Sequence, residues 1–256
     1  MIKKAIFFDL DGTLYFREKA IEGAIETVDY LKTKGYICRF LTNTDSKKTL
    51  HVLDKIKKLG FNIELDEIYT PVTASVKFLR CNKESKIYPL VSDNIINEYD
   101  EFTISEENVD YIIIGDCRDK INYDNLNKAF KVIGENTEII ALQKGRYFYD
   151  HTGKNLDTGA FVAMMEYATG KSSKVLGKPS ESFFNMLLQD LKLKPSEIII
   201  IGDDISTDIV GANNIGAMGV LVKTGKYMDQ IKLDVAIPDL VLDSVADLKG
   251  YLLLFR

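Results

Sequence analysis

The sequence predicts an α/β protein with a doubly wound, mainly parallel sheet that is interrupted by a second α/β domain. Short apolar runs alternate with amphipathic segments of helical spacing along the chain, which is the pattern of repeated βαβ units. This rhythm changes near Asn82 and resumes near residue 174, which indicates an insertion. A chain of 256 residues is long enough for a core and a smaller domain. We therefore expect a core of residues 1–78 and 174–256, and an inserted domain of residues 79–173.

The opening part of the core is expected to contain three strands and three helices. The apolar run before Asp9 has the length of a buried strand and ends at a turn signal, Gly12. Gly35 and Gly60 each follow a segment with apolar residues at helical spacing and mark helix ends. Strands are expected at residues 5–8, 36–41 and 68–69, and helices at residues 21–31, 50–59 and 72–79.

Apolar runs and helical spacing also predict the strands and helices of the insertion and of the final third of the chain. The run Glu197–Ile201 is almost purely β-branched, as expected of a central strand that is buried on both faces. In the insertion, strands are expected at residues 86–91, 109–114, 138–142 and 146–149, and helices at 123–133 and 158–168. In the final third, strands are expected at residues 174–176, 197–201, 218–222 and 235–237, and helices at 183–191, 207–215 and 245–254.

Composition and charge exclude several classes of protein. The chain is 46% hydrophobic and 28% charged, with 33 basic and 38 acidic residues and a formal charge of −5. This mixed, slightly acidic balance speaks against a broad surface for nucleic acid or anionic membrane. The three cysteines are odd in number and widely spaced, and no apolar run is long enough for a signal peptide core or a membrane span. We expect a cytoplasmic protein without nucleic-acid or membrane partners.

Residues able to do chemistry follow several of the expected strands. Asp9 and Asp11 follow the first strand, Thr42 the second, and Asp203 the strand of residues 197–201. The carboxyl ends of parallel strands lie at one edge of a sheet, where open α/β sheets bind ligands. The Gly-Lys turn at residues 177–178 can bring a cation to the same edge, so these groups are expected to form one site.

The residue types at this edge suit the transfer of a phosphoryl group. Asp9 is our candidate nucleophile and Asp11, two residues on, the candidate general acid and base. A phosphomonoester repels a carboxylate, so a divalent cation is needed, and Mg²⁺ takes one or two protein carboxylates; Asp9 and Asp203 are the candidates. Lys178 is expected to neutralise a phosphoryl oxygen.

Two further residues have supporting roles in this interpretation. The Thr42 hydroxyl and nearby backbone N–H groups would donate to the phosphate. Gly12 permits a tight turn after the first strand, and the hydroxyl of Thr13 helps to hold that turn.

The same residues resemble the motifs of a known family. Asp9-Leu10-Asp11-Gly12-Thr13 matches the D-x-D-G-T signature of the haloacid dehalogenase-like (HAD) superfamily of hydrolases. Its other three motifs are matched, in order, by Thr42, by Lys178, and by Gly202-Asp203-Asp204 with Asp208. The long insertion resembles the C2 type of α/β cap found in NagD-like members. Stretches at residues 39–44, 159–169 and 219–227 are similar to the branch with the HAD-like hydrolase domain-containing proteins and phospholysine phosphohistidine inorganic pyrophosphate phosphatase.

The resemblance implies a role for each matched residue. Asp9 would be the nucleophile and Asp11 the acid and base, with Mg²⁺ held by Asp9, the backbone carbonyl of Asp11, and Asp203. Asp204 and Asp208 would act through water or orient the metal ligands. The phosphate would be held by Thr42, Asn43 and Lys178, and a homodimer through the cap is expected.

The substrate and several alternatives stay open at this point. The leaving group is expected to contact cap loops at residues 90–93 and 146–152, the second of which contains His151. A phosphotransferase or mutase would use the same aspartyl-phosphate, and a catalytically weak phosphate-binding or interaction protein is the alternative outside the enzymes. Dehalogenation fits less well, because the acidic fourth motif suits a phosphoryl site with metal. The small phosphorylated substrate is not identified by these residues.

Overall fold

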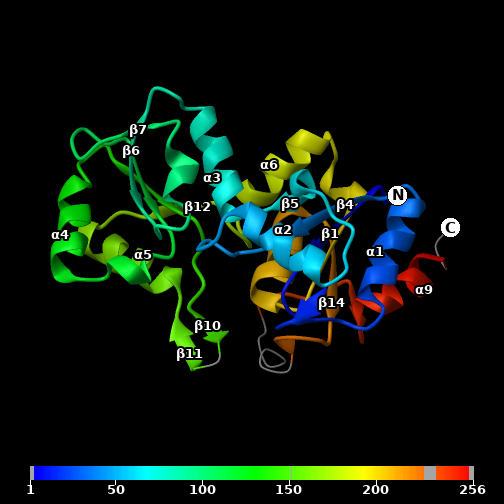
Figure 1. The fold of residues 1–256 in the computed structure, drawn as a ribbon. Helices are drawn as coiled ribbons and strands as arrows, with labels where there is room; N and C mark the ends of the chain where they lie inside the picture. The colour runs from blue at the N-terminus through cyan, green and yellow to red at the C-terminus, as the bar shows by residue number, and fades with distance from the viewer. Residues whose placement is uncertain (1–2, 151, 228–234, 254–256) are drawn as a thin grey trace. The chain divides into compact units, whose positions relative to one another are not determined.

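The computed structural model describes residues 3–150, 152–227 and 235–253 (Figure 1). His151 and the far end of the expected closing helix lie outside these residues. Contacts divide the chain into two compact units, which we call unit 1 and unit 2. Unit 1 contains residues 1–42, 49–69 and 178–256, and unit 2 contains residues 43–48 and 70–177. The expected domain division, after residue 78 and before residue 174, stays a prediction.

Unit 1 is built on a six-stranded sheet in which every pair is parallel, in the order β15-β14-β13-β1-β4-β5. The strands β1 and β13 are neighbours although nearly 200 residues separate them, and Phe8 pairs with both Ile201 and Phe40. The strand order reverses between β1 and β13, which is where doubly wound sheets bind ligands. The strands are β1 (Ala5–Asp9), β4 (Ile37–Leu41), β5 (Ile68–Tyr69), β13 (Ile198–Gly202), β14 (Met218–Val222) and β15 (Leu240–Leu242).

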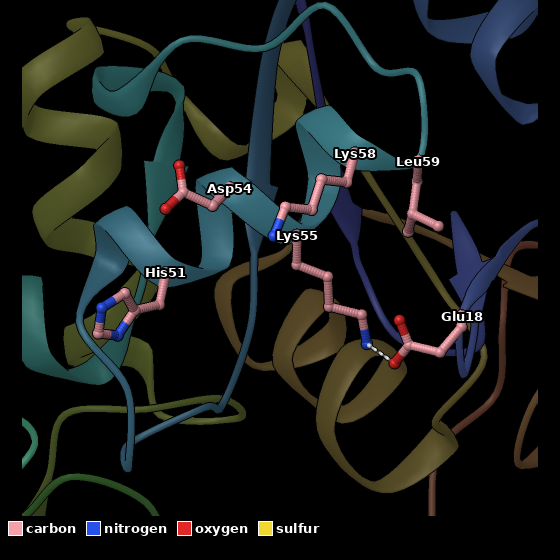
Figure 2. A pocket seen from close by; sticks show the side chains of 6 residues that line it. All are labelled: Glu18, His51, Asp54, Lys55, Lys58 and Leu59. Carbon is pink, nitrogen blue, oxygen red and sulfur yellow. Dashed lines mark ion pairs between the residues drawn. The ribbon is translucent and has the colours of Figure 1, made fainter.

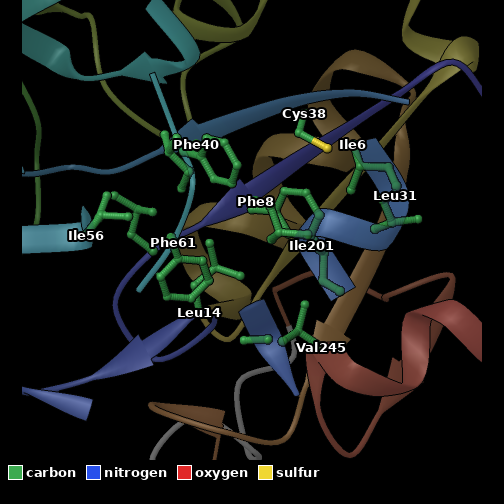
Figure 3. Packing of buried hydrophobic residues seen from close by; sticks show 14 of the residues in the cluster. Ile6, Phe8, Leu14, Leu31, Cys38, Phe40, Ile56, Phe61, Ile201 and Val245 are labelled. Atoms are coloured by element: carbon green, nitrogen blue, oxygen red, sulfur yellow. The ribbon is translucent and has the colours of Figure 1, made fainter. Parts of the chain in front are cut away.

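Helices cover both faces of this sheet, as the continuous apolar strands predicted. On one face, Phe8 and Ile201 join a cluster with apolar residues of α1, α2 and α9 (Figure 3). On the other face, Leu221 packs with Ile205 and Ile209. The described α-helices of unit 1 are α1 (Ala24–Thr33), α2 (Thr49–Lys58), α6 (Glu181–Leu191), α7 (Val210–Ile215) and α9 (Leu248–Leu253), and the π-helical segment η5 (Ile205–Ile209) precedes α7.

Two expectations for unit 1 need correction, and one feature was not expected. The strand expected at residues 235–237 is wrong: Val235 and Ile237 are exposed, and the strand forms after Pro238, at Leu240–Leu242. The single helix expected at residues 207–215 is a π-helical turn followed by α7. A two-stranded hairpin of β2 (Tyr15–Phe16) and β3 (Lys19–Ala20) was not expected.

Unit 2 has its own five-stranded parallel sheet, in the order β12-β9-β8-β6-β7. The strand that was expected to reopen the core, β12, pairs with β9 in this sheet. An antiparallel pair, β10 and β11, lies apart from it. The elements are α3 (Pro71–Arg80), β6 (Lys86–Leu90), β7 (Thr103–Ile104), β8 (Tyr111–Ile114), α4 (Tyr123–Val132), β9 (Glu138–Ala141), β10 (Tyr147–Asp150), β11 (Gly153–Leu156), α5 (Thr158–Thr169) and β12 (Ser173–Val175).

Both units therefore confirm a mainly parallel α/β fold, with a doubly wound sheet in unit 1. Among the described helices, none has the length and apolar character needed to cross a membrane.

Candidate active site

A buried lysine connects two acidic residues at the carboxyl edge of the unit 1 sheet. The ammonium group of Lys178 donates to Asp9 Oδ1 at 2.5 Å and to Asp208 Oδ1 at 2.7 Å. Asp9 ends β1, and Asp208 lies in η5 beyond β13. Lys178 is only 3% exposed, so its charge is compensated by protein carboxylates. Three segments far apart in the sequence thus meet at the switch point of the sheet.

Asp203 completes a cluster of three buried carboxyl groups. Oxygen atoms of Asp9, Asp203 and Asp208 all lie within 4.8 Å of one another. The Thr13 hydroxyl lies 3.2 Å from Asp9 Oδ2 and 3.3 Å from Asp203 Oδ1, and its one proton can be donated to either. Thr13 therefore bridges the end of β1 and the loop after β13, besides holding its own turn.

The electrostatics of this cluster fit a divalent cation. Burial, together with the charges of Asp9 and Asp208, raises the pKa of Asp203 well above its ordinary value. Burial opposes the charge of Lys178, but the Asp208 and Asp9 carboxylates outweigh it and raise the pKa of Lys178. Three carboxylates face one buried lysine, so the cluster carries excess negative charge when all of them are ionised. Mg²⁺ binds to oxygen ligands of this kind, so the residues present fit the ion.

Asp11 is exposed, unlike the carboxylates of the cluster. Neighbouring protein atoms that exclude water from its carboxyl group, and then the charge of Asp9, raise the pKa of Asp11. The charges of Lys55 and Lys226, and then a hydrogen bond from the backbone N–H of Arg17, act in the opposite direction and lower the pKa. A raised pKa is what a carboxyl group needs in order to hold a proton for a leaving group. Its backbone contact to metal stays a prediction.

The loop after β14 contributes contacts that the sequence did not predict. Lys226 donates its backbone N–H to Asp203 Oδ2 at 2.6 Å and its ammonium group to Asp204 Oδ2 at 2.9 Å. The Thr224 hydroxyl donates to the carbonyl of Gly12 at 2.5 Å. The sequence did contain a signal for these contacts, the Thr-Gly-Lys stretch of residues 224–226. This stretch follows a parallel strand at its carboxyl end, and the same edge of the sheet carries Asp9 and Asp203.

Two glycines leave room for the Asp203 carboxyl group. A Cβ atom added to Gly12 (φ +91°) or to Gly225 (φ +56°) would overlap Asp203 Oδ2. Both glycines also occupy the left-handed region, which other residues rarely adopt. At these two glycines, the turn after β1 and the loop after β14 therefore approach Asp203 with their backbone.

The two remaining acids of the fourth motif have different partners. Asp204 caps η5 by accepting from the backbone N–H of Ser206 at 2.9 Å and from its hydroxyl at 2.6 Å. Asp208 accepts the backbone N–H of Asp204 at 3.2 Å, while its other oxygen accepts from Lys178. Asp208 therefore belongs to the buried cluster, and Asp204 faces Lys226. Which of them contacts the metal stays a prediction.

Thr42 and Asn43 lie at the boundary between the units. Asp9 pairs with Leu41, so Thr42 continues beyond the same sheet edge, and its backbone N–H donates to the carbonyl of Tyr69 at 3.2 Å. The chain passes from unit 1 to unit 2 between Thr42 and Asn43. The side-chain oxygen of Asn43 lies close to Gly177. Gly177 directly precedes Lys178. The phosphate contacts of Thr42, Asn43 and Lys178 stay predictions.

A shallow hollow of about 310 Å³ lies on the outer side of α2. Figure 2 shows Lys55 reaching from the helix to Glu18, with 3.7 Å between the charged atoms. The hollow is also lined by His51, which is exposed. Its mixed, solvated charges give no arrangement for catalysis.

Comparisons with known proteins give matches to one family of hydrolases. Residues 6–105 match a family model described as haloacid dehalogenase-like hydrolase, and residues 175–248 match a HAD-hydrolase-like model. Haloacid dehalogenase-like hydrolase domain-containing protein 2 of Mus musculus is 38% identical over 88% of this chain and 85% of its own. Phospholysine phosphohistidine inorganic pyrophosphate phosphatase of Danio rerio is 35% identical over 95% and 90%.

Solved structures give the same assignment. The p-nitrophenyl phosphatase from Archaeoglobus fulgidus has a TM-score of 0.90 and 26% identity, covering 98% of this chain and 100% of its own. NagD from E. coli K-12 has a TM-score of 0.86 and 27% identity, covering 96% and 98%. The chain therefore belongs to the haloacid dehalogenase-like hydrolases, among their NagD-like phosphatases.

Proposed function

We propose that this phosphatase is Mg²⁺-dependent and hydrolyses a small phosphomonoester through an aspartyl-phosphate on Asp9. The observation that carries the proposal is the buried contact of Lys178 with Asp9 and Asp208, beside Asp203. It combines a nucleophile, a cation for a phosphoryl oxygen and a group of metal-binding oxygens in one place.

Asp9 and Asp203, with the backbone carbonyl of Asp11, would hold the metal ion. Asp208 would orient them through Lys178, and Asp204 through the start of η5. When bound, Mg²⁺ would offset the negative charge of both the phosphate and the carboxylates.

In the first step, an Asp9 oxygen attacks phosphorus and the bond from phosphorus to the leaving oxygen breaks. Asp11 gives its proton to that oxygen, so an alcohol leaves and Asp11 becomes a carboxylate. Lys178, Thr42 and Asn43 would hold the phosphoryl oxygens in line with the attack. Positioning of the reacting groups accounts for much of the rate acceleration, because the protein itself has little covalent chemistry to perform.

In the second step, Asp11 takes a proton from water, and the water oxygen attacks phosphorus. The bond to Asp9 breaks, which releases inorganic phosphate and restores both aspartates. The activities named for two similar proteins, p-nitrophenyl phosphatase and phospholysine phosphohistidine inorganic pyrophosphate phosphatase, support this reaction class.

Turnover of p-nitrophenyl phosphate tests the mechanism. Asp9→Asn should abolish turnover, and EDTA should do the same to the wild type, with recovery on adding Mg²⁺. Asp54→Asn, an exposed aspartate on α2, is the control. Undiminished turnover in Asp9→Asn, or in EDTA, would falsify the mechanism. Adding an acceptor alcohol to the same assay separates hydrolysis from phosphotransfer, because a transferase would release less phosphate and form a new ester.

We also propose a cytoplasmic homodimer that associates through the insertion. The cysteines are free, which suits a reducing compartment. Tyr167 of α5 is 93% exposed and Tyr123 of α4 is 78% exposed, and the two helices contact each other. Light scattering of the wild type and of Tyr167→Lys tests this: a monomeric wild type contradicts it.

A further inference from the structure

The segment of residues 43–48 is fixed to unit 2 although it lies between two stretches of unit 1 in the sequence. Asp45, at its middle, is a buried carboxyl group that is only 5% exposed. A carboxyl group is costly to bury, so its position must be supported by the contacts around it. Neither the sequence motifs nor the mechanism above uses Asp45.

The main support is a hydrogen bond to the start of α5. The Thr158 hydroxyl donates to Asp45 Oδ2 at 2.6 Å, across 113 positions of sequence. Thr158 is the first residue of α5 and is 1% exposed, so water does not compete for this contact. The partially positive amino end of the helix also favours a carboxylate there. Asp157 caps the helix through the Thr158 backbone N–H at 2.8 Å, which fixes Thr158 itself.

We propose that Asp45 and Thr158 are positioning residues, which hold the segment of residues 43–48 so that Asn43 and the adjoining Thr42 meet the phosphate. This inference rests on the proposed function, because it assumes that these two residues bind phosphate.

The short distance along the chain makes the anchor effective. Asn43 lies two positions before Asp45 and Thr42 lies three positions before it. Their Cα atoms are therefore at most about 8 and 11 Å from that of Asp45, since consecutive Cα atoms lie about 3.8 Å apart. On its other side, Asn43 is confined by Gly177, where an added Cβ would lie 3.0 Å from Asn43 Oδ1 and would overlap the Leu142 carbonyl. A displaced Asp45 would therefore move Asn43 and Thr42. A misplacement of about 1 Å can cost about 100-fold in rate.

Threonine variants of α5 test the proposal with a matched control on the same helix. Thr158→Val removes the hydroxyl and keeps the shape, whereas Thr158→Ser keeps the hydroxyl. Thr169→Val removes a hydroxyl that donates to the Met165 carbonyl at 2.7 Å, at the other end of α5. The readouts are KM and kcat for p-nitrophenyl phosphate, and the calorimetric Kd of inorganic phosphate with Mg²⁺ present.

We expect Thr158→Val to raise the Kd of phosphate and KM at least 5-fold. Thr158→Ser and Thr169→Val should stay within 2-fold of the wild type in both. The proposal is overturned if Thr158→Val matches Thr169→Val, or if serine fails to restore phosphate binding. Failure of the mechanism itself would be seen separately, as turnover by Asp9→Asn.

Discussion

At the scale of single residues, the site depends on how tightly each carboxyl group is held. Asp203 accepts the backbone N–H of Lys226, can accept the hydroxyl of Thr13, and fits into space left by Gly12 and Gly225. A side chain held on several sides loses little further freedom when a ligand binds, which favours a preorganised site. The glycines are therefore as important to the geometry as the charged residues.

Gly225→Ala tests this point, with Gly216→Ala as its control. Both glycines have positive φ, but a Cβ on Gly216 meets open space, whereas one on Gly225 overlaps Asp203. Gly216→Ala should lose about 1 kcal/mol of free energy of unfolding in urea, because alanine disfavours the left-handed region. Gly225→Ala should lose more, because its Cβ would also overlap Asp203 and the Gly12 backbone. Only Gly225→Ala should also lose turnover of p-nitrophenyl phosphate, by about 100-fold. Equal turnover in the two variants would contradict a steric role for Gly225.

The sequence could predict the acidic residues because short buried strands place them. The apolar runs before Asp9 and Asp203 are buried on both faces, so their length and composition were sufficient. Asp45 could not be predicted as an anchor, because its hydrogen bond to Thr158 joins two connecting segments and follows no periodic pattern. The strand expected at residues 235–237 failed because an apolar run alone does not distinguish a strand from an exposed loop.

At the scale of elements, the loop after β14 makes hydrogen bonds to the segments that follow two other strands, β1 and β13. It contacts the turn after β1 through Thr224, and the residues after β13 through Lys226. Two lysines of this loop make ion pairs of similar length in different surroundings. Lys226 pairs at 2.9 Å with Asp204, whose side chain is 8% exposed, and Lys223 pairs at 2.7 Å with Asp243, whose side chain is 81% exposed.

Methionine at these two positions should separate a surface ion pair from a structural one. Lys223→Met should change the free energy of unfolding by less than about 0.5 kcal/mol, as is usual for exposed pairs. Lys226→Met should cost about 1 kcal/mol or more, because it removes the cation from a buried carboxylate. It should also lower turnover about 10-fold by loosening Asp204 at the start of η5. Urea unfolding and p-nitrophenyl phosphate turnover measure both effects, and identical results for the two variants would refute the distinction.

At the scale of the whole molecule, each unit has its own parallel sheet, and the chain passes between the units four times. These crossings follow Thr42, Lys48, Tyr69 and Gly177. Two of them adjoin predicted phosphate-binding residues, Thr42 with Asn43 and Lys178. Because a chain of two units need not unfold in one step, stability is best compared between variants under matched conditions.

The pH dependence of stability should reveal the buried Asp45. Burial, and then the charges of Asp157 and Asp116, raise the pKa of Asp45 to about 7, although its hydrogen bond from Thr158 acts in the opposite direction. The ordinary value, 3.8, applies to the unfolded chain. Between these two pH values the folded protein binds the proton and the unfolded chain does not. Stability from this group is therefore greatest below about pH 4 and is lost as pH rises towards 7.

Asp45→Asn should remove this loss. Relative to the wild type, the free energy of unfolding of Asp45→Asn should increase between pH 4 and 7, with a slope of up to about 1.4 kcal/mol per pH unit, and should level off above pH 7. Other acids titrate in both proteins and cancel in the difference. Urea unfolding followed by circular dichroism at several pH values measures it, and Asp54→Asn controls for the loss of one negative charge. A difference that does not change between pH 4 and 7 would show that Asp45 is ionised in the fold with an ordinary pKa. The hydrogen bond from Thr158 would then outweigh the cost of burying the carboxylate.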